Sequence, residues 1–302
     1  MDIQYYITLV QEDKLAFMAL PIFILAIFLE KWYDHRNELK LYDNKDLFAS
    51  VGMLIITAIV EFIPKVLAFV AIIYLHSISP LAEVVGRQWW AWLALIFLDD
   101  LSYYAFHRAN HEVRLFWAGH VSHHSSEHMN FGTALRQGAG ERIHKYFFWL
   151  WLPLLGFDAI MIFTVMSINL IYQFWVHTDL VKKFPAPVEF VFNTPSHHRV
   201  HHASNIRYLD RNHAGMFILW DRLFGTFSEE LDSEKPVYGL TENIHTNNPA
   251  VVASHEYISL WKDVWHAPGL LNKLKYLFYA PGWSHDKEDK RAKTLRKELK
   301  VA

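Results

Sequence analysis

The sequence contains no cysteine. This absence excludes disulfides, cysteine zinc sites, iron–sulfur clusters and a thiol nucleophile, so any bound metal must have nitrogen or oxygen ligands. An excess of one charge is also absent, because 29 Lys and Arg stand against 31 Asp and Glu. The chain therefore lacks the basic field of a nucleic-acid-binding protein, and we expect no nucleic-acid partner. A hydrophobic fraction of 52% with only 20% charged residues excludes a disordered chain.

Four long apolar stretches predict a protein that crosses a membrane. Leu15–Lys31 is close to the length of one span and lacks the basic start and cleavage site of a signal peptide. The others cover residues 47–75, 89–106 and 146–176. The second stretch is either one kinked helix or a hairpin, and the fourth has the length of a short hairpin. We therefore expect an all-α, polytopic membrane helical bundle.

The basic residues predict the orientation of this bundle. The linker 36–46 carries three of them, whereas the loop after Leu75 carries only Arg87. The positive-inside tendency places the linker in the cytoplasm, which favours a single kinked helix over residues 47–75. The later stretches then bring the polar, histidine-rich segments to the cytoplasmic side, where they form a helical cap.

Histidine is the unusual residue of this chain. It occurs 19 times, and 12 of these positions lie between His107 and His202. HxxxH occurs once and HxxHH twice, and these spacings place the imidazoles on one face of a helix. A single metal needs only three or four protein ligands, so the set predicts two metals with four or five nitrogen ligands each. The predicted ligands are His107, His111, His120, His123, His124, His177, His198, His201 and His202.

The remaining histidines do not follow these spacings. We interpret His128, His144 and His213 as surface or supporting residues, and the scattered others as non-ligands. Asp99 and Asp100 precede the HxxxH motif by a turn or two. Two interpretations of them stay open: they accept the second N–H of a ligand imidazole, or they are a paired charge inside the membrane.

Several longer strings carry a resemblance. They are WAGHVSHHSSEHMNFGTALRQG (117–138), YQFWVHT (172–178), NTPSHHRVHH (193–202), WDRLFGTF (220–227) and PGLLNKLKYLFYAPGW (268–283). With the three histidine motifs, they resemble the fatty acid hydroxylase and sterol desaturase superfamily of membrane di-iron oxygenases, and most of all its alkylglycerol monooxygenase branch. The resemblance extends from about Asp99 to Trp283.

The resemblance implies a site and its cofactors. It assigns the nine histidines as ligands of two iron ions, which zinc can replace in the isolated protein. Gln173 stands where some fatty acid hydroxylases have another histidine, and His197 is a candidate to fill that coordination position. Glu112 matches an acidic position associated with a reduced pterin such as tetrahydrobiopterin. The implied co-substrates are O2 and a separate two-electron donor, because no fused cytochrome segment is present.

The implied function is hydroxylation of a lipid C–H bond, with cleavage of an alkylglycerol ether to an aldehyde and a glycerol as the first expectation. A fatty acid or sterol hydroxylase or desaturase is the alternative. From other classes, a metal transporter, a structural zinc protein and a zinc hydrolase also stay open. We expect one membrane-embedded oxygenase domain over residues 1–302, with a catalytic core at about 89–228 and a cytoplasmic extension at 229–302.

Overall fold

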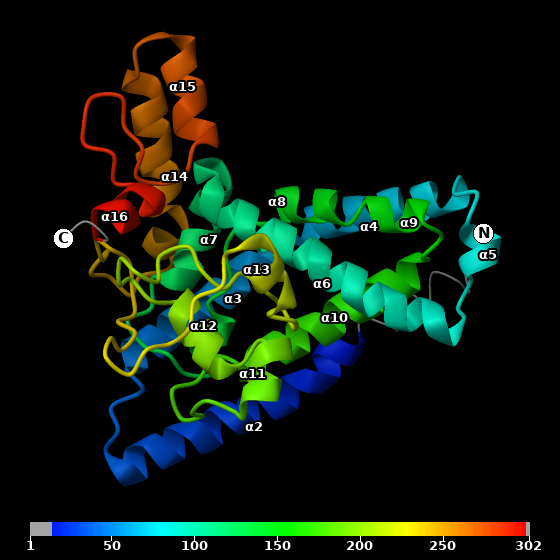
Figure 1. Ribbon diagram of the computed structural model, residues 1–302, viewed down its shortest axis with the longest axis horizontal. Helices are drawn as coiled ribbons and strands as arrows, with labels where there is room; N and C mark the ends of the chain where they lie inside the picture. Colours follow the sequence, from blue (N-terminus) through cyan, green and yellow to red (C-terminus); the bar gives the residue numbers. More distant parts are fainter. Residues whose placement is uncertain (1–13, 300–302) are drawn as a thin grey trace.

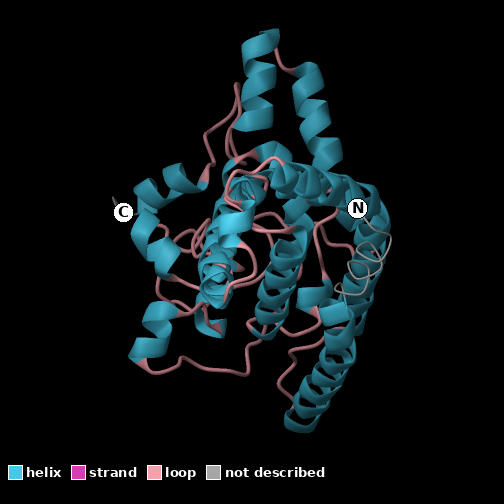
Figure 2. Cartoon of the chain, turned by 90° about the vertical axis from the view of Figure 1, so that its right-hand side faces the viewer, coloured by secondary structure: helices cyan, strands magenta, loops and turns pink. Residues whose placement is uncertain are grey.

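The computed structural model describes residues 14–299, and within this range it contains helices and loops but no β-strand (Figures 1 and 2). This confirms the all-α prediction. The helices are α2 (Lys14–Asn37), α3 (Asn44–Val60), α4 (Phe62–Ser77), α5 (Ala82–Val85), α6 (Trp89–Glu112), α7 (Arg114–His124), η1 (Thr133–Leu135), α8 (Arg142–Lys145), η2 (Tyr146–Phe148), α9 (Trp151–Leu154), α10 (Ala159–Trp175), α11 (Ala186–Val191), α12 (Pro195–His201), α13 (Leu219–Phe224), α14 (Pro249–His266), α15 (Gly269–Phe278) and α16 (Ala292–Leu299).

An apolar arm forms one half of the molecule. Helices α4, α6, α9 and α10 pack together in it, and the short α5 lies at its tip, on the right of Figure 1. Its core contains the fully buried Leu95, Trp149 and Ile162. Helix α10 begins at Asp158, whose carboxylate accepts a hydrogen bond from the Met161 amide at 2.9 Å. This N-cap satisfies one of the free amides at the helix start and fixes where the return helix begins.

The predicted apolar stretches are helical. Residues 47–75 fall in α3 and α4, which meet at Glu61 with a bend of 49°. A hairpin would reverse the chain direction, so this bend corresponds to the kinked-helix alternative. Residues 146–176 turn back on themselves as expected. The part before the turn consists of the short helices η2 and α9, and α10 follows the turn. No described helix is by itself long and apolar enough to cross a bilayer, and α3 with α4 meets that criterion only as a bent pair. The polytopic bundle therefore stays a prediction.

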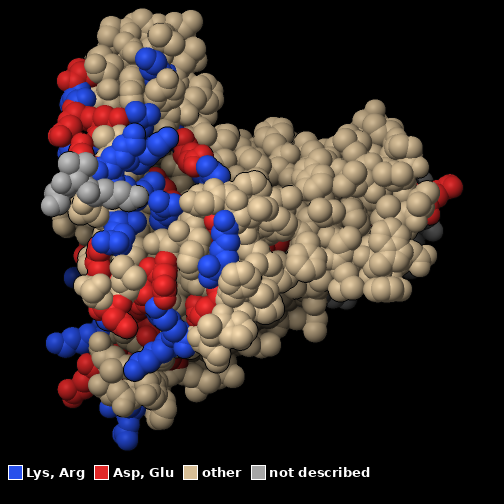
Figure 3. Space-filling model, viewed as in Figure 1, with Lys and Arg blue, Asp and Glu red and all other residues tan. Residues whose placement is uncertain are grey.

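The other half of the molecule carries most of the charged side chains (Figure 3). Helices α14 and α15 form a projecting hairpin here, and α14 packs against α7 and α3. Arg114 of α7 holds α14 with two ion pairs, at 2.8 Å to Glu256 and 2.7 Å to Asp263. The segment after residue 229 is thus packed onto the histidine-bearing helices.

Three chain segments meet where the two halves join. Helix α6 runs back from the arm and ends with HxxxH, and the extended Val113 separates it from α7, which ends with HxxHH. Helix α10 delivers His177 directly after its last turn. Helix α12 begins with Pro195 at its first position and a Thr194–His197 capping box, so its start is fixed locally.

Candidate metal centre

The nine histidines predicted as ligands lie together in two adjacent groups, and all nine are buried. Within each group, one ring nitrogen of every member lies within 4.8 Å of the others. The first group is His107, His111, His120, His124 and His201; the second group is His123, His177, His198 and His202. The division into five and four matches the number of nitrogen ligands expected for two metal ions.

The distances between ring nitrogens fit metal coordination. His120 Nε2 lies 3.1 Å from the Nε2 atoms of both His107 and His124. In the second group, His177 Nε2 lies 2.9 Å from His198 Nε2 and 3.3 Å from His123 Nε2. Two nitrogens bound to one ion at about 2.1 Å and at right angles are about 3.0 Å apart. The donor set is therefore spaced as a bound ion requires.

In four of the nine rings, a backbone carbonyl holds the opposite nitrogen, Nδ1. The Nδ1 atoms of His107, His123 and His177 donate to backbone carbonyls of His213, Arg136 and Gln173 at 2.8, 2.9 and 2.7 Å. His201 Nδ1 donates in the same way to the Arg211 carbonyl at 3.0 Å. These bonds keep the proton on Nδ1 and leave the lone pair of Nε2 free to bind a metal ion. The buried Nε2 atoms of His111 and His201 have no hydrogen-bond partner, which fits a ligand role.

Two carboxylates complete this outer layer, and neither was predicted. Glu141 Oε1 lies 2.6 Å from His120 Nδ1, and Asp210 Oδ1 lies 3.2 Å from His111 Nδ1. Carboxylates in this position orient the imidazole and make it a stronger ligand. Both lie far in sequence from their histidines, and no local spacing marks them.

Asp99 and Asp100 do not have the imidazole-binding role considered for them. Asp99 accepts from Trp149 Nε1 at 2.6 Å and from Asn169 Nδ2 at 3.0 Å. Asp100 accepts from the backbone amides of Met216 and Phe217, at 2.6 and 2.9 Å. These bonds tie α6 to α10 and to the loop before α13. About two turns of α6 separate them from His107, and none of these hydrogen-bond partners is a histidine.

Burial keeps the imidazoles neutral. Loss of solvent lowers the pKa of His123, His198 and His202 well below the usual range, and neighbouring imidazoles lower it further. Burial also lowers the pKa of His177, to about 4. A neutral imidazole keeps the lone pair that binds a metal ion. Nine buried imidazoles in one place are an environment that a cation would stabilise.

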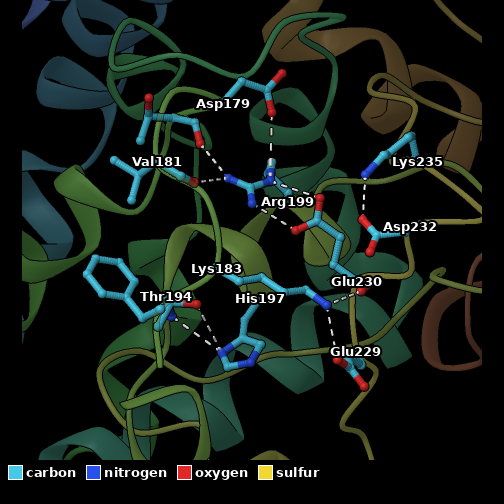
Figure 4. Close-up of polar contacts among 12 residues, drawn as sticks. Asp179, Val181, Lys183, Thr194, His197, Arg199, Glu229, Glu230, Asp232 and Lys235 are labelled. Carbon is cyan, nitrogen blue, oxygen red and sulfur yellow. Dashed lines mark hydrogen bonds and ion pairs between the residues drawn. The ribbon is translucent and has the colours of Figure 1, made fainter. Parts of the chain in front are cut away.

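A buried arginine fixes the helix that carries the third motif (Figure 4). Arg199, between the histidines of α12, contacts Glu230 through Nη2 at 2.8 Å and donates to the Val181 carbonyl at 2.7 Å. It also donates to the Thr178 carbonyl at 3.1 Å, directly after His177. Arg199 thus ties α12, which carries His198, to the segment that directly follows His177.

The three other predicted site residues lie outside both histidine groups. Gln173 donates from Nε2 to Asn169 Oδ1 at 2.6 Å. His197 uses Nε2 for Glu189 at 2.9 Å, and its Nδ1 faces the start of α12, as Figure 4 shows. Glu112 is half exposed and accepts from Arg108 at 2.8 Å. Their expected roles stay predictions.

The histidines expected to be non-ligands include one with unusual surroundings. His144 bonds to Asn110 at 2.7 Å and stacks on Phe116, as a supporting residue does. His213 is fully buried, and neither of its ring nitrogens has a hydrogen-bond partner. Its ring centre lies 5.0 Å from that of His111. Sequence spacing gave no signal for this proximity, because the loop that carries His213 approaches from outside the three motifs.

Two cavities reach the histidines. An apolar cavity of about 360 Å³ contacts His120 of the first group and His123 and His177 of the second, and side chains of α2, α3, α6 and α10 line it. A polar cavity of about 470 Å³ contacts His111, His124, His201 and His202. The histidines that face one cavity are therefore different from those that face the other.

Known proteins resemble this chain over the segment that carries the histidines. The family model described as fatty acid hydroxylase matches residues 92–226. The alkylglycerol monooxygenase of Homo sapiens is 44% identical over 199 residues, which are 66% of this chain and 44% of the relative. The alkylglycerol monooxygenase of Danio rerio is 36% identical over 285 residues, covering 93% and 63% of the two chains. That of Caenorhabditis elegans is 34% identical over 302 residues, covering 93% and 56%.

The matches cover only part of each relative. The chain spans about half the length of the curated relatives that it matches. No solved structure matches the chain. All three histidine motifs and His177 lie within the matched residues 92–226, so the segment that matches the family model also carries the two histidine groups.

Proposed function

We propose that this protein is a di-iron monooxygenase that hydroxylates a C–H bond of a lipid with O2, because residues 92–226 match the fatty acid hydroxylase family model. The observation that carries the proposal is the apolar cavity that contacts both histidine groups. Much of its wall is apolar and suits an alkyl chain, and the cavity contacts predicted ligands of both metals. A substrate held there has its reacting carbon beside the metal pair.

The chain's own residues hold and shield this site. The nine imidazoles supply neutral nitrogen ligands for two ferrous ions, and zinc fits the same donor set. When bound, the metals supply the redox chemistry by which O2 becomes an oxidant able to attack an unactivated C–H bond. Glu141 and Asp210 fix two of the imidazoles, and burial shields all nine from solvent.

The proposed substrate is an alkylglycerol ether, because the relatives named alkylglycerol monooxygenase match up to 93% of this chain. Hydroxylation of the carbon next to the ether oxygen gives a hemiacetal, which breaks down to a fatty aldehyde and a glycerol. Gln173 lines the apolar cavity, so its amide is available to a polar group of the substrate. A fatty acid or sterol hydroxylase or desaturase would use the same cavity, and the products distinguish these alternatives.

We also propose a multi-pass membrane location with the metal site on the cytoplasmic side and a separate electron donor. The location is supported by the surface of the arm, which carries few charged side chains apart from its tip, and by the charged half of the surface (Figure 3). A non-enzymatic metal transporter is the alternative from another class. A transporter needs its ligands near mid-membrane on discontinuous helices. Here the ligands lie on α6 and α7, on α12 and its C-cap, and two residues after α10. The arm meets the charged half at this place, which favours the enzyme.

A turnover experiment tests the proposal. Membranes with the protein receive a 1-O-alkylglycerol, ferrous iron, O2 and tetrahydrobiopterin, and products are followed by mass spectrometry. We expect a fatty aldehyde and glycerol, with one atom of 18O2 entering the aldehyde precursor. The His123→Ala variant should be inactive, because it loses a ligand that also faces the apolar cavity.

The control experiments separate the alternatives. Turnover without O2 and reductant would indicate a hydrolase. Survival of the ether while a fatty acid or sterol gains a hydroxyl group or a double bond would retain the oxygenase and exclude ether cleavage. The pterin role that the resemblance gives Glu112 is tested by Glu112→Ala, which should weaken pterin dependence while both metals stay bound.

A further inference from the structure

The hairpin of α14 and α15 exposes large apolar side chains near its tip. Trp265 is 81% exposed, and Leu270 and Leu271, at the start of the returning helix, are 73% and 66% exposed. No part of the chain between residues 14 and 299 covers these three side chains. Single exposed apolar residues are ordinary on a folded protein, but a group of this size indicates a binding surface.

On each helix of the hairpin, the exposed apolar side chains form one stripe. The stripe of α14 comprises Val251, Ile258, Trp261 and Trp265, and that of α15 comprises Leu270, Leu271, Leu274 and Phe278. Intervals of three, four or seven residues place side chains on one face of a helix. The buried Val252 and Leu260 lie on the opposite face of α14, which packs against α3 and α7. The two stripes therefore remain free for another partner.

The charges of the hairpin favour an anionic partner. Between residues 249 and 278, the acidic residues are Glu256 and Asp263, and both form ion pairs with Arg114 of α7. The remaining charged residues of this range are Lys262, Lys273 and Lys275. The hairpin thus combines apolar stripes with cationic side chains, which is the composition of helices that lie on anionic lipid.

The placement of the hairpin fits the surface of a bilayer. Figures 1 and 2 show it projecting crosswise to the apolar arm, and α15 lies on the arm side in Figure 1. Its flank toward the arm carries few charged side chains in Figure 3. A bilayer that the arm crosses along its length has its surface crosswise to the arm, and thus along the hairpin. With 10 residues, α15 is about 15 Å long, which is too short to cross the hydrocarbon core.

We propose that the α14–α15 hairpin docks on the surface of an anionic phospholipid bilayer, with its apolar stripes at the boundary between headgroups and acyl chains and its lysines at the phosphate groups. The inference rests on the proposed membrane location and adds a second membrane contact, made by the charged half of the molecule. Trp261 and Trp265 suit this boundary, because an indole has an apolar ring and a polar N–H. Since α14 packs against α7, the docked hairpin would fix the histidines of α7 relative to the bilayer.

Fluorescent probes on single cysteines test the docking, because the chain has no cysteine of its own. Leu271→Cys carries a polarity-sensitive probe on the hairpin. Leu67→Cys carries it on the exposed side of α4 in the arm, and Ser233→Cys carries it on the charged half. The full chain is placed in nanodiscs that hold one chain each, made of phosphatidylcholine alone or with phosphatidylserine. Aqueous iodide and lipids with a nitroxide near the headgroup then quench the probe from opposite sides.

In discs with phosphatidylserine, we expect the nitroxide lipid to quench the Leu271 and Leu67 probes and iodide to quench the Ser233 probe. Lys262→Glu with Lys273→Glu should raise iodide quenching at Leu271 by about twofold or more, because acidic side chains are repelled by anionic lipid. The matched control, Lys182→Glu with Lys235→Glu, reverses two exposed lysines outside the hairpin and should leave the Leu271 probe unchanged.

The controls separate this docking from the membrane location on which it rests. Equal iodide quenching of the Leu271 and Ser233 probes in both kinds of disc, with the Leu67 probe still in contact with lipid, would overturn the docking alone. Iodide quenching at Leu67 as well would also refute the membrane location. Protection of the Leu271 probe in detergent that is lost on dilution would mean that a second copy covers the stripes, which also overturns the proposal. No turnover is measured, so the result is independent of the oxygenase activity.

Discussion

At the residue scale, the orientation of each imidazole determines which of its two nitrogens can bind a metal ion. A histidine has two donor nitrogens, and a metal can use only one that is free. Six of the nine rings have Nδ1 bonded to an oxygen, through four backbone carbonyls and two carboxylates. The centre therefore depends on loops outside the motifs as much as on the motifs themselves.

The Glu141–His120 contact gives a prediction for metal affinity. Glu141→Gln keeps the size of the side chain and removes the charge that makes His120 a better ligand. We expect the affinity of the first group for its metal to fall by about 10–100-fold. A titration against a competing chelator measures this. Glu229→Gln, at an exposed ion pair with Lys183, is the control and should retain wild-type affinity; equal affinities in both variants would contradict the role.

The two-group arrangement gives a prediction for metal content. His201→Ala removes a ligand of the first group, and His123→Ala removes one of the second. We expect elemental analysis to find close to two metal ions per wild-type chain, about one in each single variant and none in the double variant. His266→Ala, on the exposed end of α14, should leave the content unchanged. One metal in the wild type would refute the two-group interpretation.

At the element scale, sequence spacing predicted which residues share a helix face but not how they divide between metals. In α7, His120 and His124 join the first group while His123 joins the second. In α12 the division is reversed, because His198 and His202 join the second group and His201 the first. Each HxxHH motif thus contributes to both groups. That division depends on how α7 and α12 face each other, and no pattern within one helix contains it.

The same limit explains the supporting residues. The nine ligands stand out because their spacing is local, whereas Glu141 lies 21 residues from His120 and Asp210 lies 99 residues from His111. A lone carboxylate in a loop has no periodicity to mark it. Asp99 and Asp100 drew attention by their place within an apolar stretch, yet they bond to α10 and a distant loop instead. Only the tertiary packing distinguishes these two cases.

The short helix α12 gives a prediction for stability. Arg199→Ala leaves Glu230 buried without its partner and removes the donors to the carbonyls of Thr178 and Val181. Breaking a buried pair of this kind costs about 3–5 kcal/mol, and we expect a lower melting temperature and loss of the second metal. Arg207→Ala is the control, because its pair with Glu234 is exposed and should contribute about 0–1 kcal/mol. Equal melting temperatures would contradict the structural role of Arg199.

At the scale of the whole molecule, the separation of polarity organises the function. The apolar cavity opens among the helices of the arm and their neighbours, and the polar cavity lies under the charged segment 239–292. Histidines of the two groups line both cavities. The two histidine groups are thus reached by two cavities of different polarity.

This separation gives a prediction for membrane topology, and cysteine labelling tests it because the chain has no cysteine. Arg36 lies at the end of α2 beside the charged half, and Glu83 lies in α5 at the tip of the apolar arm. Both side chains are exposed, so either position accepts a cysteine without loss of packing.

In intact cells, a membrane-impermeant thiol reagent should label Glu83→Cys and leave Arg36→Cys unlabelled, because the basic linker after α2 favours the cytoplasm. Permeabilised cells should show labelling at both positions, which controls for reactivity. The reverse pattern would place the metal site on the outer side of the membrane. Equal labelling of both positions in intact cells would mean that the arm does not cross the bilayer, and the lipid would then have to enter the apolar cavity from the membrane surface.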